Sequence, residues 1–396
     1  MGVSPYEGRW RGAIRTLSAL DRSCNQPQLA CNLGIAPSSL LESPVNLWRR
    51  LPPLLLLVIF ALPLAAACAE GDGPGGGAPP GDGLTGTDND FSAEDGKLKV
   101  TTTVAPLTSI VLNIGGDRVH IHGLIPPGVD SHTYEPKPSD AKVLAKADLL
   151  IMNGAGLEGT TEKIARENLK DKSKIYKLAD NTLSGEDEKA GFLYDFSFPR
   201  AGGNPNPHLW MNPQYALKYA DLTRQWLSEN DAANASYYQA NFDKYAVVLK
   251  QLDQAIRKDQ ATVPEGNRKL LTYHDSWAYW ARLYGWTVIG AIQPSDFKEP
   301  SAKELADLIT QIKSEKVPAV FGSEVFPSKT LQTIARETGA KFEDQLRDDE
   351  PPGKIGDRNY TYVGMVVEDM RLLFAVLGGN ADETSQVEPR NVFLPR

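Results

Sequence analysis

Hydrophobic and polar positions from residue 97 onward predict strands that alternate with helices. In residues 118–126, "RVHIHGLIP", they alternate as in a strand with one buried face, and "DLLIMNG" is apolar enough for a buried strand. A helix between these two is expected to take its cap from Ser139 or Asp140. The elements predicted in this part are a strand at 98–106, a helix at 107–116, a strand at 118–126, a helix at 138–147 and a strand at 148–154.

Two helices with little between them interrupt this alternation, at 212–230 and 231–261. The second is long for a globular helix and carries apolar residues at helical spacing, among them Phe242, Tyr245 and Leu249. Strands and helices then alternate again. They are predicted as strands at 269–273, 287–293, 317–322 and 340–343 and as helices at 276–285, 301–315, 328–339 and 362–378.

This order of elements predicts an α/β fold with parallel sheets that carry helices on both faces. At 396 residues the chain is long enough for two modest domains. We expect an N-terminal lobe at 97–230 and a C-terminal lobe at 262–380, joined by one long rigid helix at 231–261. Residues 381–396 are interpreted as a tail.

The N-terminal part predicts export rather than a folded domain. Residues 45–67 run from a short basic segment into an apolar core of signal-peptide length, and three prolines argue against a membrane-spanning helix. Residues 1–44 are too long and unpatterned to begin such a signal, so we interpret them as a non-native extension ahead of a true start at Val45. The run Ala65–Cys68 resembles a bacterial lipobox, which would make Cys68 a lipidated N-terminal residue; the alternative is an ordinary signal peptidase site.

Residues 68–96 are rich in Gly, Pro and Asp and are predicted to form a flexible tether. A lipid, a tether and a globular body together predict an extracytoplasmic protein anchored to the cell membrane. Of the three cysteines, Cys24 and Cys31 fall in the extension and none follows Cys68. The mature domain therefore has neither disulfides nor thiolate ligands, and any metal site must use nitrogen and oxygen.

The charge balance argues against one large class of partner. The chain has a formal net charge of −8, and its first 67 residues carry a net +3, so the remainder carries −11. Composition is otherwise ordinary for a globular protein, with 41% hydrophobic and 23% charged residues. An acidic body disfavours nucleic-acid binding and is compatible with a cationic ligand.

Three of the five histidines lie in comparable places. His132 and His208 sit in proline-stiffened loops, and His274 follows a buried strand and precedes a helix. Loops at the carboxyl ends of parallel strands are where open α/β sheets bind ligands. His208 comes 76 residues after His132 and 66 residues before His274, so only the fold can bring them into one site.

A set of three imidazoles usually takes a fourth, anionic ligand, because carboxylate oxygen both coordinates the metal ion and offsets its charge. Asp344 directly follows the predicted strand at 340–343, which is the same kind of place, and Asp348 and Asp349 are near alternatives. Four protein ligands would close a tetrahedral site, whereas catalytic zinc keeps one position open for water. The pattern therefore favours a binding protein over an enzyme.

Four segments carry a resemblance to a known family. They are "IPPGVDSHTYEPKPSD", "PHLWMNP", "TYHDSWAYWARLYGW" and "EDQL" followed by "NYTYVGM". In this order they resemble the four ligand segments of the cluster A-I solute-binding proteins, the zinc and manganese receptors of bacterial ABC transporters, and the likeness covers residues 97–378. It implies a metal ion between two α/β lobes, held by His132, His208, His274 and Asp344.

The resemblance also implies a function. It is that of a monomeric lipoprotein receptor that binds a divalent metal ion with high affinity, hands it to the membrane permease of an ABC transporter and does no chemistry. Manganese receptors often carry glutamate where this chain has His274, which favours zinc. Zinc receptors often have a histidine-rich loop before the second ligand, whereas residues 180–207 hold no histidine and are acidic. We expect zinc, with manganese as the alternative.

Two other functions remain as alternatives. A zinc hydrolase would need an exchangeable water on the metal, and the chain has no H-E-x-x-H helix. A surface adhesin, as proposed for lipoproteins of this family, would need an exposed adhesive patch.

Other residues near the candidate ligands have their own interpretations. Asp275 either orients the imidazole of His274 or caps the following helix. His120 and His122 are interpreted as a structural pair on one strand. Four aromatic residues are expected to keep the site dry: Tyr134, Trp210, Tyr273 and Trp277.

Overall fold

The computed structural model describes residues 91–183, 191–293, 300–325 and 329–394, which all belong to one compact unit, Gly75–Arg396. The predicted N-terminal extension, the signal peptide, Cys68 and the tether up to residue 90 lie outside the described residues. Within the described ranges, no helix has the length and apolar character needed to cross a bilayer.

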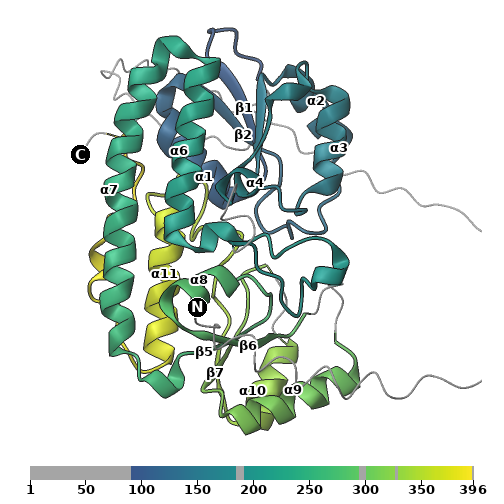
Figure 1. Ribbon diagram of the computed structural model, residues 1–396, viewed down its shortest axis with the longest axis vertical. Helices are drawn as coiled ribbons and strands as arrows, with labels where there is room; N and C mark the ends of the chain where they lie inside the picture. The colour runs from purple at the N-terminus through teal and green to yellow at the C-terminus, as the bar shows by residue number, and fades with distance from the viewer. Residues whose placement is uncertain (1–90, 184–190, 294–299, 326–328, 395–396) are drawn as a thin grey trace, which may run out of the picture. The chain divides into compact units, whose positions relative to one another are not determined.

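The first lobe is built on a four-stranded parallel sheet (Figure 1). Its elements are β1 (Leu98–Thr102), α1 (Ala105–Gly115), β2 (Val119–Gly123), α2 (Pro138–Lys146), β3 (Leu149–Met152), α3 (Gly159–Asn168), β4 (Ile175–Lys177) and α4 (Leu178–Thr182). The strand order is β2-β1-β3-β4. Successive side chains of β3 enter different apolar clusters, Leu149 with residues of α1 and Leu150 with residues of α2 and α3. Helices therefore cover both faces of this sheet, as predicted.

The second lobe repeats the arrangement on another parallel sheet, in the order β6-β5-β7-β8. Its elements are β5 (Lys269–Thr272), α8 (Ala278–Tyr284), β6 (Thr287–Ala291), α9 (Ala302–Glu315), β7 (Ala319–Phe321), α10 (Lys329–Thr338), β8 (Lys341–Glu343) and α11 (Tyr362–Val376). Leu271 packs in the apolar cluster of α9 and α10, whereas Leu270 packs in the cluster that includes α8 and α11. The predicted fold class, two parallel-sheet lobes with helices on both faces, is confirmed.

Two long helices, α6 (Pro213–Asn230) and α7 (Ala235–Asp259), connect the lobes. Asn212 begins α6, because its side-chain oxygen accepts from the backbone N–H groups of Gln214 and Tyr215. The 25 residues of α7 give it a length of about 37 Å, and it runs beside both lobes in Figure 1. One continuous apolar cluster includes residues of both sheets and of α6, α7 and α11. The predicted long joining helix is therefore confirmed and is packed along its length.

The start of α2 differs from the prediction. Its N-cap is Lys137, not Ser139 or Asp140, because Pro138 occupies the first helical position, where its fixed φ and missing N–H are favourable. Asp140 instead accepts from the backbone N–H of Lys137 at 2.7 Å. The same carboxylate accepts from the hydroxyl of Tyr134, so this helix end also anchors the loop that carries His132.

Several ordered parts were not predicted. The sequence pattern gave no elements for α3, β4 and α4, and β4 has only three residues, too few to show an alternation. Phe91, in the last part of the predicted tether, is buried against α2 and β3. In the predicted tail, Asn391 accepts a hydrogen bond from Asn113 of α1. Both segments therefore contact the first lobe.

Candidate metal site

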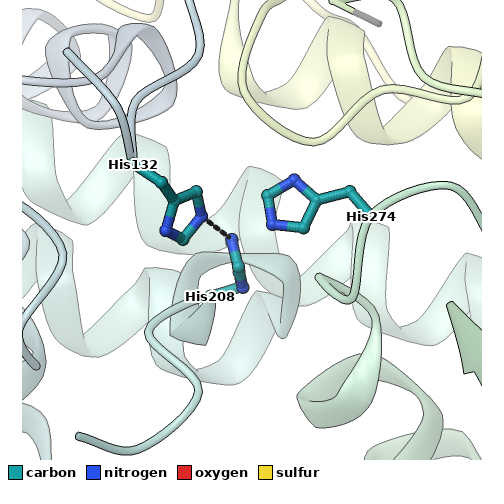
Figure 2. Close-up of side chains that lie close together, drawn as sticks. All are labelled: His132, His208 and His274. Atoms are coloured by element: carbon teal, nitrogen blue, oxygen red, sulfur yellow. Dashed lines mark hydrogen bonds between the residues drawn. The ribbon is translucent and has the colours of Figure 1, made fainter. Parts of the chain in front are cut away.

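His132, His208 and His274 lie together at the ends of three loops (Figure 2). One ring nitrogen of each lies within 4.8 Å of one ring nitrogen of the other two. The Nε2 atoms of His132 and His208 are 3.1 Å apart, and the ring centroid of His274 is 4.7 Å from each of the other two. The structure thus brings together the three histidines that the sequence selected, and the first and second lobes both contribute.

The spacing of these nitrogens suits a single small cation. Two nitrogens bound tetrahedrally to one zinc ion at about 2.0–2.1 Å lie about 3.3–3.4 Å apart. The 3.1 Å between His132 and His208 is close to that value, and shifts of about 1 Å would bring His274 into the same sphere. In Figure 2 one ring nitrogen of His274 faces the other two imidazoles.

The loop between β2 and α2 holds His132. Asp130 fixes this loop locally, since its carboxylate accepts from the backbone N–H of His132 at 2.9 Å and from the hydroxyl of Thr133 at 2.8 Å. Ser131 donates to the carboxylate of Asp349 in the second lobe at 2.8 Å. The loop that carries His132 is therefore held by hydrogen bonds within the loop and by one hydrogen bond to the second lobe.

Asn206 sets the orientation and tautomer of His208. The Asn206 Nδ2 group donates to the carboxylate of Asp195 and to the backbone carbonyl of Asp275, both at 2.9 Å, so its Oδ1 atom is left to accept. That oxygen accepts from the His208 Nδ1–H at 2.8 Å. The Nε2 lone pair of His208 consequently points toward the other imidazoles, an arrangement typical of metal-ligating histidines.

His274 lies two residues after the end of β5 and is buried. The hydroxyl of Thr272 donates to its backbone carbonyl. Its Nδ1 atom lies 3.4 Å from Oδ2 of Asp348, which is also buried. Asp348 thus lies beside the three-histidine group, although its carboxylate is not one of the grouped ligand atoms.

The structure does not bring Asp344 to the three-histidine group. Asp344 follows β8 and is partly exposed, where its carboxylate accepts from the side chain of Gln345. Asp348, one of the two alternatives, takes the place beside His274 instead. Asp349 contacts Ser131. The chain runs four residues past the strand end before it reaches the site, and the sequence pattern did not show this.

Burial keeps the imidazoles uncharged. It lowers the pKa of His274 to about 3 and lowers those of His132 and His208 well below the usual value, with their neighbouring histidines adding to the effect. A neutral imidazole is the form that binds a metal ion. The site is therefore ready to bind a cation without first losing protons from its histidines.

Burial raises the pKa of the carboxyl groups near the site, whereas it lowers that of the imidazoles. Burial raises the pKa of Asp348 well above its usual value and that of Asp349 to about 7, and the nearby Glu324 carboxyl adds to both shifts. Oδ1 of Asp348 is buried and makes no hydrogen bond to the described residues. A bound divalent cation would favour the ionised form of this carboxyl group.

Of the four aromatic residues expected around the histidines, Trp210 contacts one of them. Trp210 is fully buried, with its ring centroid 5.1 Å from that of His208. The other three predicted residues are also buried: Tyr134, Tyr273 and Trp277. Phe198 was missed; its ring lies 5.9 Å from both His132 and His208, and its loop "DFSFPR" carries no signal for such a role.

The remaining candidates lie elsewhere. His120 contacts the carboxylate of Asp95 at 2.9 Å, and His122 packs edge-on to Phe91, so neither joins the three-histidine group. Asp275 is not a helix cap, because α8 begins after Trp277. Its buried side chain lies beside Asp195 and Ser197, and burial raises its pKa.

Comparisons with known proteins find a family of metal-uptake components and several metal-binding relatives. A family described as "Zinc-uptake complex component A periplasmic" matches residues 100–375. The metal ABC transporter substrate-binding lipoprotein FimA of Streptococcus parasanguinis is 27% identical over 275 residues, which cover 69% of this chain and 87% of that relative. The iron-binding protein YfeA of Yersinia pestis is 30% identical over 270 residues, covering 68% of this chain and 83% of YfeA. Among solved structures, the periplasmic zinc-binding protein TroA of Treponema pallidum matches with a TM-score of 0.64 at 26% identity, over 72% of this chain and all of TroA.

Proposed function

Because this chain belongs to the family of periplasmic zinc-uptake components, we propose that it is an extracytoplasmic receptor for one divalent transition-metal ion, which it delivers to an ABC-transporter permease. FimA, a substrate-binding lipoprotein of such a transporter, and TroA, a zinc-binding protein, support this assignment. His132, His208 and His274 bind the ion, and Asp348 supplies the carboxylate.

The observation that carries the proposal is the convergence of three imidazoles from three separate loops, two of them buried and that of His132 partly buried. The lowered pKa values show that burial disfavours the protonated form of these imidazoles. Taking their polar nitrogens out of water also costs free energy. A cation at their centre would offset it. A bound ligand therefore explains why three histidines from separate loops meet at one point.

The donor set favours zinc over manganese. Three imidazole nitrogens and one carboxylate suit borderline-soft zinc, whereas manganese prefers more oxygen ligands. YfeA, which is 30% identical to this chain over 270 residues, is named an iron-binding protein. Competition between metal ions is therefore the measurement that identifies the ion this chain prefers.

A receptor fits the site better than a hydrolase does. Four protein ligands leave no coordination position for an attacking water. The family is one of metal-uptake components. An adhesive function would be supported by an exposed apolar patch. In the described part of the chain only two large hydrophobic residues are exposed, Val129 and Val247, so no such support is found there.

The cellular context extends the proposal. A signal peptide at 45–67, lipidation at Cys68 and a tether after it would hold a monomeric receptor at the membrane surface, where it can meet a permease. The lipoprotein name of FimA supports this arrangement.

Elemental analysis of protein purified without chelator, followed by competitive Zn²⁺ and Mn²⁺ titration, tests the function. We expect one metal ion per chain and tighter binding of zinc. His274→Ala should lose high-affinity binding, because it removes one of three nitrogen ligands, while His120→Ala outside the group should bind as the unmodified protein does. A chain that binds no stoichiometric metal, or metal-dependent ester or amide hydrolysis, would contradict the proposal.

A further inference from the structure

The backbone of the loop that carries Asp348 is fixed from two sides. The indole Nε1–H of Trp210, in the first lobe, donates to the Asp348 carbonyl at 2.8 Å. On the other side the Asp348 N–H donates to Oε1 of Glu324 at 3.2 Å. Glu324 follows β7 of the second lobe and is remote in sequence from both partners.

One oxygen of Glu324 accepts three consecutive backbone N–H groups. They belong to Asp348, Asp349 and Glu350, at 3.2, 3.2 and 3.0 Å. Its second oxygen accepts from the hydroxyl of Ser323 at 3.1 Å. Successive N–H groups that point to one place form a concave anion-binding nest, and here a carboxylate of the same chain fills it.

We propose that Glu324 is a positioning residue for metal binding: it fixes the backbone of Asp348–Glu350 so that the Asp348 carboxylate is held beside His274, one of the three histidines proposed to bind the ion. This inference rests on the proposed function. The contacts of Glu324 are to the backbone of this loop, so we infer that it acts through Asp348.

Glu324 matters for the position of this loop because it accepts three of the loop's backbone N–H groups. Without an acceptor at the Glu324 position, three N–H groups of a buried or half-buried segment would need other partners. The loop would reorient to find them, and the Asp348 side chain would move with it. Shifts of about 1 Å in a ligand are enough to weaken a metal site, and loss of a residue that supports a ligand typically costs about tenfold to a hundredfold in affinity.

Zn²⁺ competition titration and the absorption spectrum of bound Co²⁺, which reports coordination geometry, test the role. Glu324→Gln keeps one oxygen acceptor and should weaken zinc binding about tenfold, and Glu324→Ala should approach a hundredfold. Both should change the Co²⁺ spectrum. Glu343→Gln is the matched control, because Glu343 accepts from one backbone N–H earlier in the same segment, that of Gln345, and should change neither readout.

A double-mutant cycle separates positioning from a general effect on folding. In an Asp348→Asn background, Glu324→Gln should cause little further loss of affinity, since the group through which it acts is already altered. If Glu324→Ala fails to fold, the zinc affinity and Co²⁺ spectrum of Glu324→Gln alone test the proposed role. Unchanged affinity and spectrum in Glu324→Gln, or an equal loss in both backgrounds, would overturn the positioning role. Absence of stoichiometric zinc in the unmodified protein would overturn both this inference and the proposed function.

Discussion

Trp210 and Asp348, 138 residues apart in the sequence, are joined by a 2.8 Å hydrogen bond from the indole Nε1–H to the backbone carbonyl. Trp210 comes two residues after His208, and Asp348 lies beside His274. The bond therefore links the histidine loop of the first lobe to the acidic loop of the second. The carbonyl of Trp210 also accepts from the hydroxyl of Tyr362 at the start of α11, so the contact is supported from behind.

Trp210→Phe should speed metal release several-fold. The substitution removes the only hydrogen bond that the indole makes in the described structure and leaves the Asp348 carbonyl without that donor, which costs about 1–3 kcal/mol. Stopped-flow chelator competition measures the release rate. Trp280→Phe is the control, because Trp280 is equally buried but its Nε1 has no hydrogen-bond partner among the described residues. Equal release rates in the two variants would contradict the prediction.

Asn206→Ala should weaken zinc binding by about tenfold to a hundredfold. The variant loses the acceptor that holds the His208 Nδ1–H, so the imidazole can rotate and adopt the wrong tautomer. Isothermal competition with a chelator of known affinity measures the loss. Asn113→Ala removes another buried asparagine, which bonds Ser109 and Asn391 away from the site. It should lower stability without changing affinity, and equal affinity losses would show that Asn206 acts only through folding.

The sequence could predict the fold class and the three histidines because both leave local signals. Strands such as β3 are apolar throughout, and the histidine loops are marked by prolines and by their place after strands. These signals depend on neighbouring residues only. The long helix α7 was equally visible, since its apolar positions recur at helical spacing.

The acid beside His274 could not be chosen this way. Asp344 stands at the strand end, yet the backbone beyond it makes hydrogen bonds with Glu324 and Trp210, which lie far away in the sequence. Asn206 was missed although it stands only two residues before His208, because an asparagine there is also an ordinary turn residue. Such residues are identified by tertiary contacts rather than by pattern.

Glu158 should make the protein less stable as pH rises toward neutrality. Burial raises its pKa to about 7, despite hydrogen bonds from Thr103 and from the backbone of Asn153 and Gly154. The folded state thus holds this proton more tightly than the unfolded chain, so the contribution is fully present below the unfolded pKa and is lost as pH rises through about 7. Its size is on the order of 3 kcal/mol.

Denaturant unfolding between pH 5 and 8 tests the role of Glu158. Glu158→Gln cannot lose a proton, so its stability should fall less over this range than that of the unmodified protein. Glu167→Gln alters an exposed position on the same helix, α3, and should leave the pH dependence unchanged. Parallel pH profiles for all three proteins would show that Glu158 does not titrate in this range.

Metal binding should change the separation of the lobes only slightly. One apolar cluster contains Val100 and Leu149 of the first sheet, Leu270 and Phe321 of the second, and Leu249 of α7. Opening a wide hinge would expose this apolar surface to water at about 25 cal/mol per Å². Small-angle scattering of metal-free and zinc-loaded protein should therefore give nearly the same radius of gyration. A large compaction on loading would contradict the rigid connection.

Zinc affinity should fall as pH drops, with Asp348 as the main cause. Imidazoles with ordinary pKa values would lose the metal ion in the usual histidine range, but burial moves the histidine pKa values down, that of His274 to about 3. Burial moves the pKa of Asp348 up, so its carboxyl group takes up a proton at a higher pH than usual. Zinc must displace that proton, and binding weakens as pH falls through the range where Asp348 is protonated. Asp348→Asn should bind more weakly and with a flatter pH profile. Asp344→Asn should change neither, since the Asp344 carboxylate contacts the side chain of Gln345 and not His274. If the zinc affinity of Asp348→Asn falls with pH as steeply as that of the unmodified protein, the proton that competes with zinc belongs to another group.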